Sequence, residues 1–215
     1  MRIIALITGK GGVGKSTLST NIAVAAMEAG ETVLAIDVDD QGTLAGWGQL
    51  RQADTPSVAH LPPDGHASNE LTAVIEAARD KYSLVIVDTP GEDSPFTHNA
   101  MTLADLCLVP LRPSRPDAMG LKRTIEALMI GKKHFAFVLN QCSPAHSTRA
   151  NEMAAGLISL GFLAEPLICQ RADFQDAFAG GKGVTEYDPT GKAAGEIRKL
   201  WGWIDRETKS KKAAA

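Results

Sequence analysis

A glycine-rich segment near the start of the chain has the residue types and the spacing that bind phosphate groups. Residues 9–16 match the pattern G-x-x-x-x-G-K-[ST] in full. Glycines let the backbone wrap closely around an anion, and the helix that follows adds the positive end of its dipole. In this pattern Lys15 neutralises the β- and γ-phosphates of a nucleotide, and the Ser16 hydroxyl ligates Mg²⁺. The predicted nucleotide-binding residues are Gly11, Gly12, Val13, Gly14, Lys15, Ser16 and Thr17.

A second lysine, Lys10, lies inside the same segment. Lys15 already supplies the cation that a phosphate site takes from its own subunit, so Lys10 is hard to explain within one subunit. A second cation at this place is useful if it reaches a nucleotide on a facing subunit. Lys10 therefore predicts that the protein acts as a dimer. The competing interpretation is a solvated loop lysine.

Two acidic segments follow apolar runs of strand length. Asp37 and Asp39 come directly after the run 32–36, and Asp88 follows the run 82–87. The carboxyl end of a parallel strand lies beside the phosphate crevice. Carboxylates placed there can hold a metal-bound water or accept a hydrogen bond from an attacking water. The sequence therefore predicts that these aspartates meet the glycine-rich segment.

The rest of the chain supplies elements that could bring these segments together. The run 3–7, the glycine-rich segment and the helical stretch 17–27 occur in the order strand, loop, helix. Further strands are predicted at 57–61, 106–110, 134–140 and 163–169, and further helices at 70–79, 117–130, 149–160 and 196–206. Repeated strand–helix units predict an α/β fold: a single-domain P-loop NTPase whose mostly parallel sheet is flanked by helices on both faces.

Composition and charge narrow the function classes. The 215 residues suit one domain with a sizeable core, and no apolar run reaches transmembrane length. Met1-Arg2 leads directly into the first strand, so no signal peptide is expected. The net charge of −3 does not indicate a nucleic-acid binder, so any DNA affinity must come from a local patch. Cys107, Cys142 and Cys169 are far apart in the sequence and indicate free thiols in a reducing cytoplasm.

The pattern K-G-G-x-G-K-[ST], which begins at Lys10, resembles the deviant Walker A motif of the ParA/MinD family of signature-lysine ATPases. The run from Asp37 to Gly42 is similar to that family's D-x-D-P-Q-G element, with Asp40 where the family usually has proline. Asp88-Thr89-Pro90 matches the family's D-T-P. Segments 108–114 and 180–189 resemble two further family stretches. The resemblance covers an ATPase domain at 1–208, followed by a basic tail at 209–215 that is expected to be disordered.

The resemblance implies an ATPase that uses ATP and Mg²⁺, with Lys10, Lys15 and Asp39 as catalytic residues. Lys10 would cross the dimer interface to the partner's phosphates, and Asp39 would position the attacking water. Ser16, Asp37 and Asp88 would hold Mg²⁺, the aspartates through water. Asn140 falls where the family often contacts adenine. The residues expected to form the two switches are Asp37, Asp39, Gln41, Asp88, Thr89, Pro90 and Gly91.

Within that family the chain looks like the short ParA-type partition ATPases, such as ParF, because it starts at the phosphate-loop strand without a helix-turn-helix region. Such proteins bind DNA without sequence preference as ATP-bound dimers, which requires cations aimed at phosphates. A ParB-like partner would then stimulate hydrolysis and release the DNA. The expected location is the cytoplasm, at the nucleoid when ATP is bound. The predicted DNA-binding residues are Lys182, Lys192, Arg198, Lys199 and Arg171.

Three alternatives stay open from the sequence. Some short ParA relatives position a cytoplasmic protein cluster instead of a plasmid or chromosome locus. MinD-like proteins bind membrane through a C-terminal amphipathic helix, and Ile197, Leu200, Trp201 and Ile204 fall at helical spacing. We favour a helix that packs on the sheet, so a membrane partner is not expected. A metabolic P-loop ligase or small-molecule kinase would need a substrate domain or lid, which the sequence does not indicate.

Overall fold

The computed structural model describes the backbone of residues 1–62, 67–145, 148–160 and 162–214, and the side chains of the same residues except 67, 68, 162 and 211–214. Within this part of the chain, seven strands form one sheet in the order β3-β2-β4-β1-β5-β6-β7, and all neighbouring strands run parallel. The strands are β1 (Arg2–Leu6), β2 (Val33–Asp37), β3 (Ser57–His60), β4 (Leu84–Asp88), β5 (Leu106–Leu111), β6 (Phe135–Leu139) and β7 (Phe162–Leu163).

The sheet is parallel because a helix follows nearly every strand, and its central strands are apolar because both faces are covered. All five residues of β1, β2 and β4 are buried. The chain places β2 to β4 on one side of β1 and β5 to β7 on the other. The connections therefore diverge beside β1, which is where open α/β sheets form a crevice for ligands.

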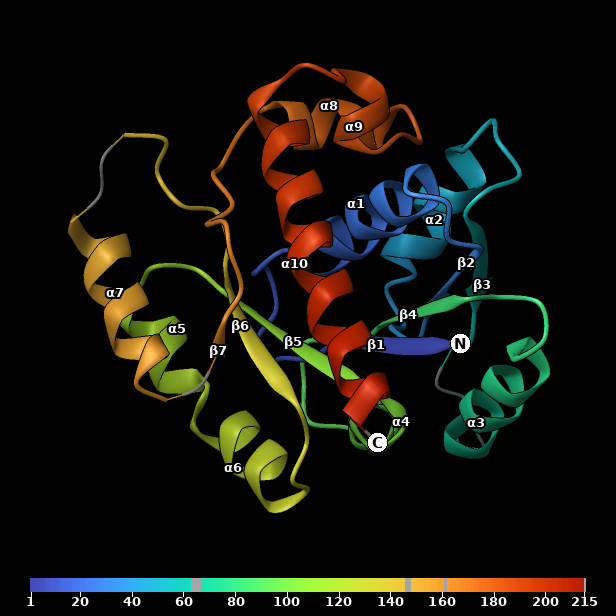
Figure 1. Ribbon diagram of the computed structural model, residues 1–215, viewed down its shortest axis with the longest axis horizontal. Coiled ribbons are helices and arrows are strands. Elements are labelled where there is room, and N and C mark those ends of the chain that lie inside the picture. The colour runs from blue at the N-terminus through green and yellow to red at the C-terminus, as the bar shows by residue number, and fades with distance from the viewer. Residues whose placement is uncertain (63–66, 146–147, 161, 215) are drawn as a thin grey trace.

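Helices cover both faces of the sheet (Figure 1). Their bounds are α1 (Lys15–Glu28), α2 (Thr43–Leu50), α3 (Ala67–Ala78), α4 (Pro95–Leu103), α5 (Arg115–Gly120), α6 (Lys122–Ile130), α7 (Thr148–Ile158), α8 (Asp173–Ala179), α9 (Val184–Tyr187) and α10 (Lys192–Ala214). One buried cluster joins the sheet to α1, α2, α8, α9 and α10, and the other joins it to α3, α4, α6 and α7. The predicted fold class is confirmed.

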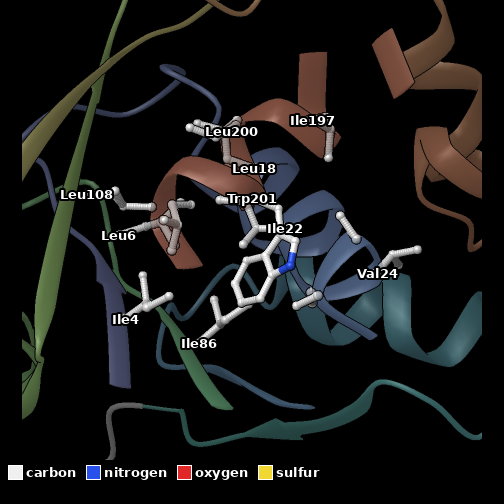
Figure 2. Packing of buried hydrophobic residues seen from close by; sticks show 14 of the residues in the cluster. Ile4, Leu6, Leu18, Ile22, Val24, Ile86, Leu108, Ile197, Leu200 and Trp201 are labelled. Atoms are coloured by element: carbon white, nitrogen blue, oxygen red, sulfur yellow. The ribbon is translucent and has the colours of Figure 1, made fainter. Parts of the chain in front are cut away.

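Helix α10 lies across the strands beside α1 and contributes to the first cluster (Figure 2). Ile197, Leu200 and Ile204 are fully buried, and Trp201 is 5% exposed. This apolar stripe packs against Ile22 of α1 and Ile4 and Leu6 of β1. The stripe is therefore a packing face, as favoured from the sequence, and it is not available to a membrane surface.

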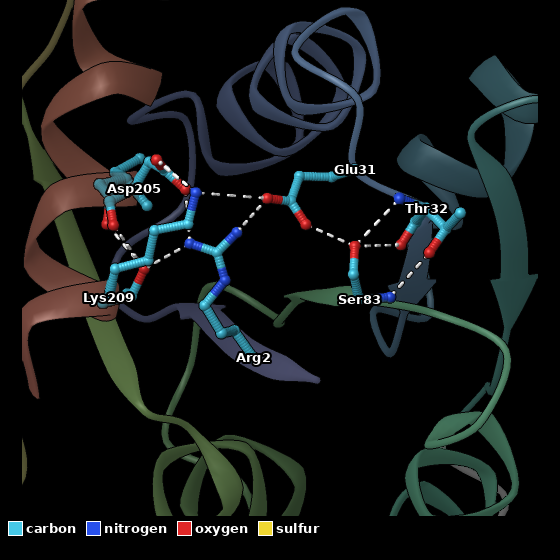
Figure 3. Close-up of polar contacts among 8 residues, drawn as sticks. Arg2, Glu31, Thr32, Ser83, Asp205 and Lys209 are labelled. Atoms are coloured by element: carbon cyan, nitrogen blue, oxygen red, sulfur yellow. Dashed lines mark hydrogen bonds and ion pairs between the residues drawn. The ribbon is translucent and has the colours of Figure 1, made fainter. Parts of the chain in front are cut away.

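A charged network ties α10 to the amino-terminal end of the sheet (Figure 3). The Arg2 guanidinium donates to Asp205 Oδ1 at 2.7 Å, to Thr208 Oγ1 at 2.9 Å and to Glu31 Oε1 at 2.5 Å. It also lies over the Trp201 ring, 5.6 Å from the centroid. Arg2 is only 5% exposed, so these partners are what make its burial tolerable.

Several predicted elements differ from the structure. The predicted strand 163–169 is wrong in extent: β7 stops at Leu163, and beyond it only a bridge between Cys142 and Cys169 continues the pairing. The predicted helix 117–130 is divided at Leu121 into α5 and α6. The tail expected to be disordered continues α10 as far as Ala214. Among the described residues, no helix is both long and apolar enough to span a bilayer.

Candidate functional site

A cavity of about 910 Å³ opens at the carboxyl end of the sheet. Three segments line it: the glycine-rich loop with the first turn of α1, the loop after β2, and the loop after β4. The parallel register places Asp88 opposite both Leu6 and Asp37, so the ends of β1, β2 and β4 meet here. The predicted site residues that line the cavity are Gly11, Gly12, Gly14, Lys15, Ser16, Thr17, Asp39, Gln41, Pro90 and Gly91.

The phosphate loop takes a conformation that only glycine adopts readily. Gly12 has φ +75° and Gly14 has φ +90°. Side chains from the end of β6 hold the loop from behind. Asn140 Nδ2 donates to the Val13 carbonyl at 2.8 Å, and Gln141 Nε2 donates to the Gly12 carbonyl at 3.2 Å. These bonds satisfy carbonyls on the outer side of the loop, so that its amides are left to face an anion.

The Asn140 contact changes the role expected for this residue. Its amide is occupied by the loop backbone, and Asn140 is only 5% exposed. A β-carbon at Gly14 would lie 2.4 Å from Asn140 Nδ2, so the glycine and the asparagine fit only together. Asn140 therefore braces the phosphate loop. Both Gly14 and Asn140 also line a smaller cavity of about 180 Å³ beside the loop, and adenine contact stays a prediction.

Lys15 starts α1 and is 7% exposed. Burial lowers the pKa of its ammonium group, and the carboxylates of Asp88 and Asp39 oppose that effect. A buried cation that faces carboxylates across an open cavity is suited to bind an anion there. Asp39 lies at the cavity wall, where its Oδ1 accepts a hydrogen bond from the Gln41 amide at 3.1 Å. That bond orients one carboxylate oxygen of Asp39 and does not use the other oxygen.

Asp88 has the features of a carboxylate that binds a cation. Its side chain is fully buried, Ser19 donates to Oδ1 at 3.0 Å, and Oδ2 has no hydrogen-bond partner. Burial raises the Asp88 pKa to about 7, although the nearby Ser16 hydroxyl, the Lys15 ammonium group and the Ser19 hydrogen bond oppose the shift. An orphaned carboxylate oxygen beside the Ser16 hydroxyl is the oxygen-rich environment that Mg²⁺ binds. The residues present therefore fit a Mg²⁺ ion at this place.

Asp37 has a structural task that its sequence position did not reveal. Its Oδ1 accepts from the Asp39 amide at 3.0 Å, and its Oδ2 accepts from the Ala45 amide at 2.9 Å. The two bonds fix the loop after β2 and the first turn of α2. Burial raises the Asp37 pKa, and the two backbone bonds oppose it. Both oxygens are thus already committed to backbone, so a bond from Asp37 to a metal-held water would have to share them.

The loop after β4 lies directly against the phosphate loop. Thr89 Oγ1 donates to the Leu6 carbonyl at 2.7 Å, which anchors the loop to β1. A β-carbon at Gly91 would lie 2.8 Å from the backbone nitrogen of Gly11. Only glycine permits this close approach. A movement of the loop after β4 must therefore displace the phosphate loop as well. This is the close coupling that a phosphate-sensing switch requires.

Lys10 has a partner in its own subunit, which the sequence analysis missed. Its ammonium group forms an ion pair with Asp117, a residue of α5 whose side chain is 1% exposed. Arg112 Nε donates to the same carboxylate at 2.8 Å. Although burial opposes the shift, hydrogen bonds from the Arg112 and Lys10 cations and from the Arg112 backbone amide hold the pKa of Asp117 well below its usual range. Lys10, which the sequence made hard to explain within one subunit, thus has a structural partner there, and its side chain remains 35% exposed.

The predicted DNA-binding residues divide into two groups. Arg171 pairs with Glu196 at 2.5 Å, and Arg198 donates to the carbonyl of Pro189 at 2.6 Å. Lys182, Lys192 and Lys199 are exposed, and the described residues form no ion pair with them. The free cations of the set thus lie between α8 and the first half of α10, and Arg171 is already committed within the fold. Lys209 of the tail pairs with Asp205 at 2.9 Å.

Comparison with known proteins gives a consistent result. Residues 4–184 match the model of the family described as "CobQ/CobB/MinD/ParA nucleotide binding domain". The chain is 30% identical over 207 residues to the maintenance of carboxysome distribution protein A of Halothiobacillus neapolitanus, covering 92% of this chain and 93% of that protein. It is 34% identical over 159 residues to the chromosome-partitioning ATPase Soj of Thermus thermophilus, covering 61% and 64%.

Solved structures share the fold. MinD of Pyrococcus horikoshii in complex with Mg-ADP superimposes with a TM-score of 0.74 at 21% identity, covering 95% of this chain and 96% of that one. An ATP complex of a McdA variant from Cyanothece gives a TM-score of 0.74 at 16% identity, with 98% and 96% covered. At these identities the likeness concerns the fold.

Proposed function

This chain belongs to the CobQ/CobB/MinD/ParA family of nucleotide-binding proteins, and from that premise we propose that it is a ParA-type ATPase that cycles between a monomer and an ATP-bound dimer on DNA. The single observation that carries the proposal is the pairing of a complete phosphate cavity with a second loop lysine, Lys10, which lies outside the cavity lining. Lys15 would serve the nucleotide of its own subunit. Lys10 pairs with Asp117 but stays 35% exposed in its side chain, so it could exchange that carboxylate for a nucleotide on a facing subunit.

In the proposed cycle ATP occupies the large cavity with its phosphates on the loop amides and Lys15. Bound Mg²⁺ would neutralise charge on the β- and γ-phosphates. Ser16 and the free Oδ2 of Asp88 are the groups placed to hold it, Asp88 through water. Asp39 would orient the attacking water with the carboxylate oxygen that the Gln41 amide does not use. Hydrolysis needs no covalent enzyme intermediate in this scheme.

Lys10 couples the nucleotide to dimerisation. In the monomer its ammonium group is held by the buried carboxylate of Asp117. A triphosphate on a facing subunit carries more negative charge than one carboxylate shared with Arg112, so the lysine gains by exchanging partners. We expect two such exchanges, one in each direction, to close a sandwich dimer around two ATP molecules. After hydrolysis the attraction weakens and the subunits separate.

The DNA-binding surface in this proposal consists of Lys182, Lys192 and Lys199, together with the partly engaged Arg198. Dimerisation joins two such surfaces, and each added phosphate contact raises affinity in a salt-dependent manner. A ParB-like partner would stimulate hydrolysis, and the protein would lie in the cytoplasm, on the nucleoid while ATP is bound.

The cargo has two candidates that the relatives favour about equally. Likeness to Soj favours a plasmid or chromosome locus. Likeness along almost the whole chain to a protein named for carboxysome distribution favours a cytoplasmic protein cluster. The common element is a DNA-bound ATPase dimer that positions something else.

DNA binding, measured with ATP and with ADP at two salt concentrations, tests the proposal. Wild-type protein with ATP and Mg²⁺ is expected to bind random-sequence duplex at low salt, and to bind much less with ADP. The triple variant Lys182→Gln, Lys192→Gln, Lys199→Gln is expected to lose binding but to keep ATP-dependent dimerisation. Arg171→Gln serves as the matched control, because its cation already pairs with Glu196. Equal DNA binding with ATP and ADP would contradict the proposed cycle.

A further inference from the structure

Two cysteines that are 27 positions apart in the sequence lie opposite each other in the fold. Cys142 and Cys169 are partners of a parallel bridge that extends the β6 side of the sheet. The Cys142 amide donates to the Ile168 carbonyl at 2.9 Å, and the Gln170 amide donates to the Cys142 carbonyl at 2.8 Å. The expectation of free thiols is confirmed for all three cysteines, but two of them are neighbours in the fold although they are far apart in the sequence.

The bridge brings the two residues within the range of a covalent bond. Paired residues on neighbouring strands are about 4.8 Å apart and point to the same side of the ladder. Disulfides join residues whose Cα atoms are roughly 4.4–6.8 Å apart. Both thiols are free in this structure. The third cysteine, Cys107 of β5, is opposite Phe135 of β6 and is fully buried.

The two thiols differ in access. Cys169 is half-buried and lines the cavity of about 180 Å³ that it shares with Gly14 and Thr17 of the phosphate site. Cys142 is 2% exposed and lies behind it. A small oxidant that enters the cavity therefore meets Cys169 first, and Cys142 is placed to react with the product.

We propose that Cys142 and Cys169 are a redox-active pair that a peroxide converts into a reversible disulfide in the wall of the nucleotide site. The peroxide transfers one oxygen to Cys169 Sγ, which becomes a sulfenic acid as the O–O bond breaks and water leaves. Cys142 Sγ then attacks Cys169 Sγ, the S–O bond breaks, and a second water leaves with the Cys142 proton. Two thiols and one hydrogen peroxide give one disulfide and two waters, and a dithiol reductant reverses the change.

The environment of the two thiols determines the rate of this oxidation. Burial raises the pKa of Cys142 to about 12, and burial together with Glu196 raises the pKa of Cys169, against the opposing charge of Arg171. Thiolate is the reactive form, so at neutral pH oxidation is slow. The pair thus responds to sustained peroxide, and not to brief exposure.

The position of the bridge links it to nucleotide binding. The residues directly before Cys142 brace the phosphate loop through its carbonyls, and the residues after Cys169 line the same small cavity. A nucleotide whose phosphates lie on Gly14 and Thr17 extends toward this cavity and covers Cys169. Bound ATP should therefore shield Cys169 from peroxide. This part rests on nucleotide binding alone, and it does not require dimerisation or DNA.

Peptide mapping of the full chain tests the pair directly. Nucleotide-free wild-type protein is treated with millimolar hydrogen peroxide, alkylated, and digested with trypsin without reductant. Trypsin places Cys142 in peptide 134–149 and Cys169 in peptide 150–171. We expect these two peptides to become disulfide-linked, lighter by two hydrogens than their sum, and to separate after dithiothreitol. Cys107 is expected to stay reduced.

Variants and nucleotide complete the experiment. Cys107→Ser is the matched control and should form the linked peptide at the wild-type rate, whereas Cys169→Ser should form none. Oxidation of Cys169 to a sulfinic or sulfonic acid with Cys142 still alkylated would overturn the pair. Mg-ATP should slow linkage several-fold in wild type and have no effect in Lys15→Ala. An unchanged rate with saturating Mg-ATP would overturn the link to the nucleotide site and leave the proposed ATPase cycle untouched.

Discussion

The two ends of the sheet hold clusters of charged side chains that are built in opposite ways. At the amino-terminal end, Arg2 is buried with Glu31, Asp205 and Thr208, and its donors have partners on several elements (Figure 3). At the carboxyl end, Asp88 is buried with one oxygen unpartnered, and Lys15 faces an open cavity. The first cluster is complete within the chain, and the second is not.

This contrast distinguishes a charged side chain that stabilises the fold from one that binds a ligand. A buried ion pair whose hydrogen bonds are all made within the chain has no group available to bind a ligand. An unsatisfied carboxylate costs folding free energy, and its presence indicates that a cation offsets the cost in another state. The pKa directions agree: burial raises the pKa of Asp88, whereas at Asp205 the effect of burial is outweighed by the Lys209 and Arg2 cations, which lower the pKa.

The largest expected effect is on hydrolysis. Asp88→Asn keeps the shape of the side chain but removes the charge that faces Mg²⁺, and we expect the steady-state rate of ATP hydrolysis to fall about 100- to 1000-fold. The measurement is phosphate release at saturating ATP and Mg²⁺, with circular dichroism to show that the variant is folded. A variant that hydrolyses ATP at the wild-type rate would place the metal elsewhere.

The opposite cluster should respond in the opposite sense. Arg2→Met leaves Glu31 and Asp205 without their shared cation, and we expect a loss of about 2–3 kcal/mol in the free energy of unfolding. ATP hydrolysis by the folded fraction should be unchanged. Urea unfolding monitored by Trp fluorescence measures the first quantity. If stability is unaffected, the network at this end is not a structural clamp.

The unpaired carboxylate of Asp88 should also affect how the free energy of unfolding depends on pH. Burial raises the Asp88 pKa from its ordinary value of 3.8 to about 7. Across that window the folded protein keeps a proton that the unfolded chain has lost, so the Asp88 contribution to stability falls as the pH rises. In metal-free buffer, Asp88→Asn should be no more stable than wild type near pH 4 and about 2 kcal/mol more stable near pH 8. An equal difference at both pH values would contradict this reading.

The smallest expected effect is a loss of stability on substitution of Lys209, which lies at the edge of the amino-terminal cluster. Lys209 is 61% exposed in its side chain and pairs with Asp205 at 2.9 Å. Exposed pairs contribute little, so Lys209→Ala should cost a few tenths of a kcal/mol. The midpoint of urea unfolding, compared with that of Arg2→Met, checks it. A loss as large as that of Arg2→Met would mean that the tail helix, and not the buried guanidinium, holds this end together.

The sequence predicted the elements better than the contacts between them. The phosphate loop and the strand ends were predictable because their signals are local: glycines at fixed spacing and apolar runs that end in aspartate. The cavity between them agrees with that prediction. By contrast, nothing near Lys10 in the sequence points to Asp117, which lies 107 positions away on α5.

The same limit applies to several other residues. Asn140 was recognised as a strand-end residue, but its contact with the Val13 carbonyl depends on how β6 packs beside the loop. Asp37 was grouped with Asp88 because both end apolar strands, yet its oxygens bind backbone amides. Arg171 is predicted to contact DNA, but it pairs with Glu196, which lies 25 positions away in the sequence and on another element. Each depends on a long-range partner, and long-range partners are set by the assembled fold.

The central claim is that Lys10 acts on a nucleotide held by a second copy of the chain. Light scattering coupled to size exclusion measures it most directly, with Asp39→Ala as the background that preserves bound ATP. In Mg-ATP that single variant should run at twice the monomer mass, and the same variant carrying Lys10→Ala should run as a monomer while still binding ATP. If the double variant forms dimers with undiminished affinity, the lysine does not join the subunits, and its pairing with Asp117 is its whole role.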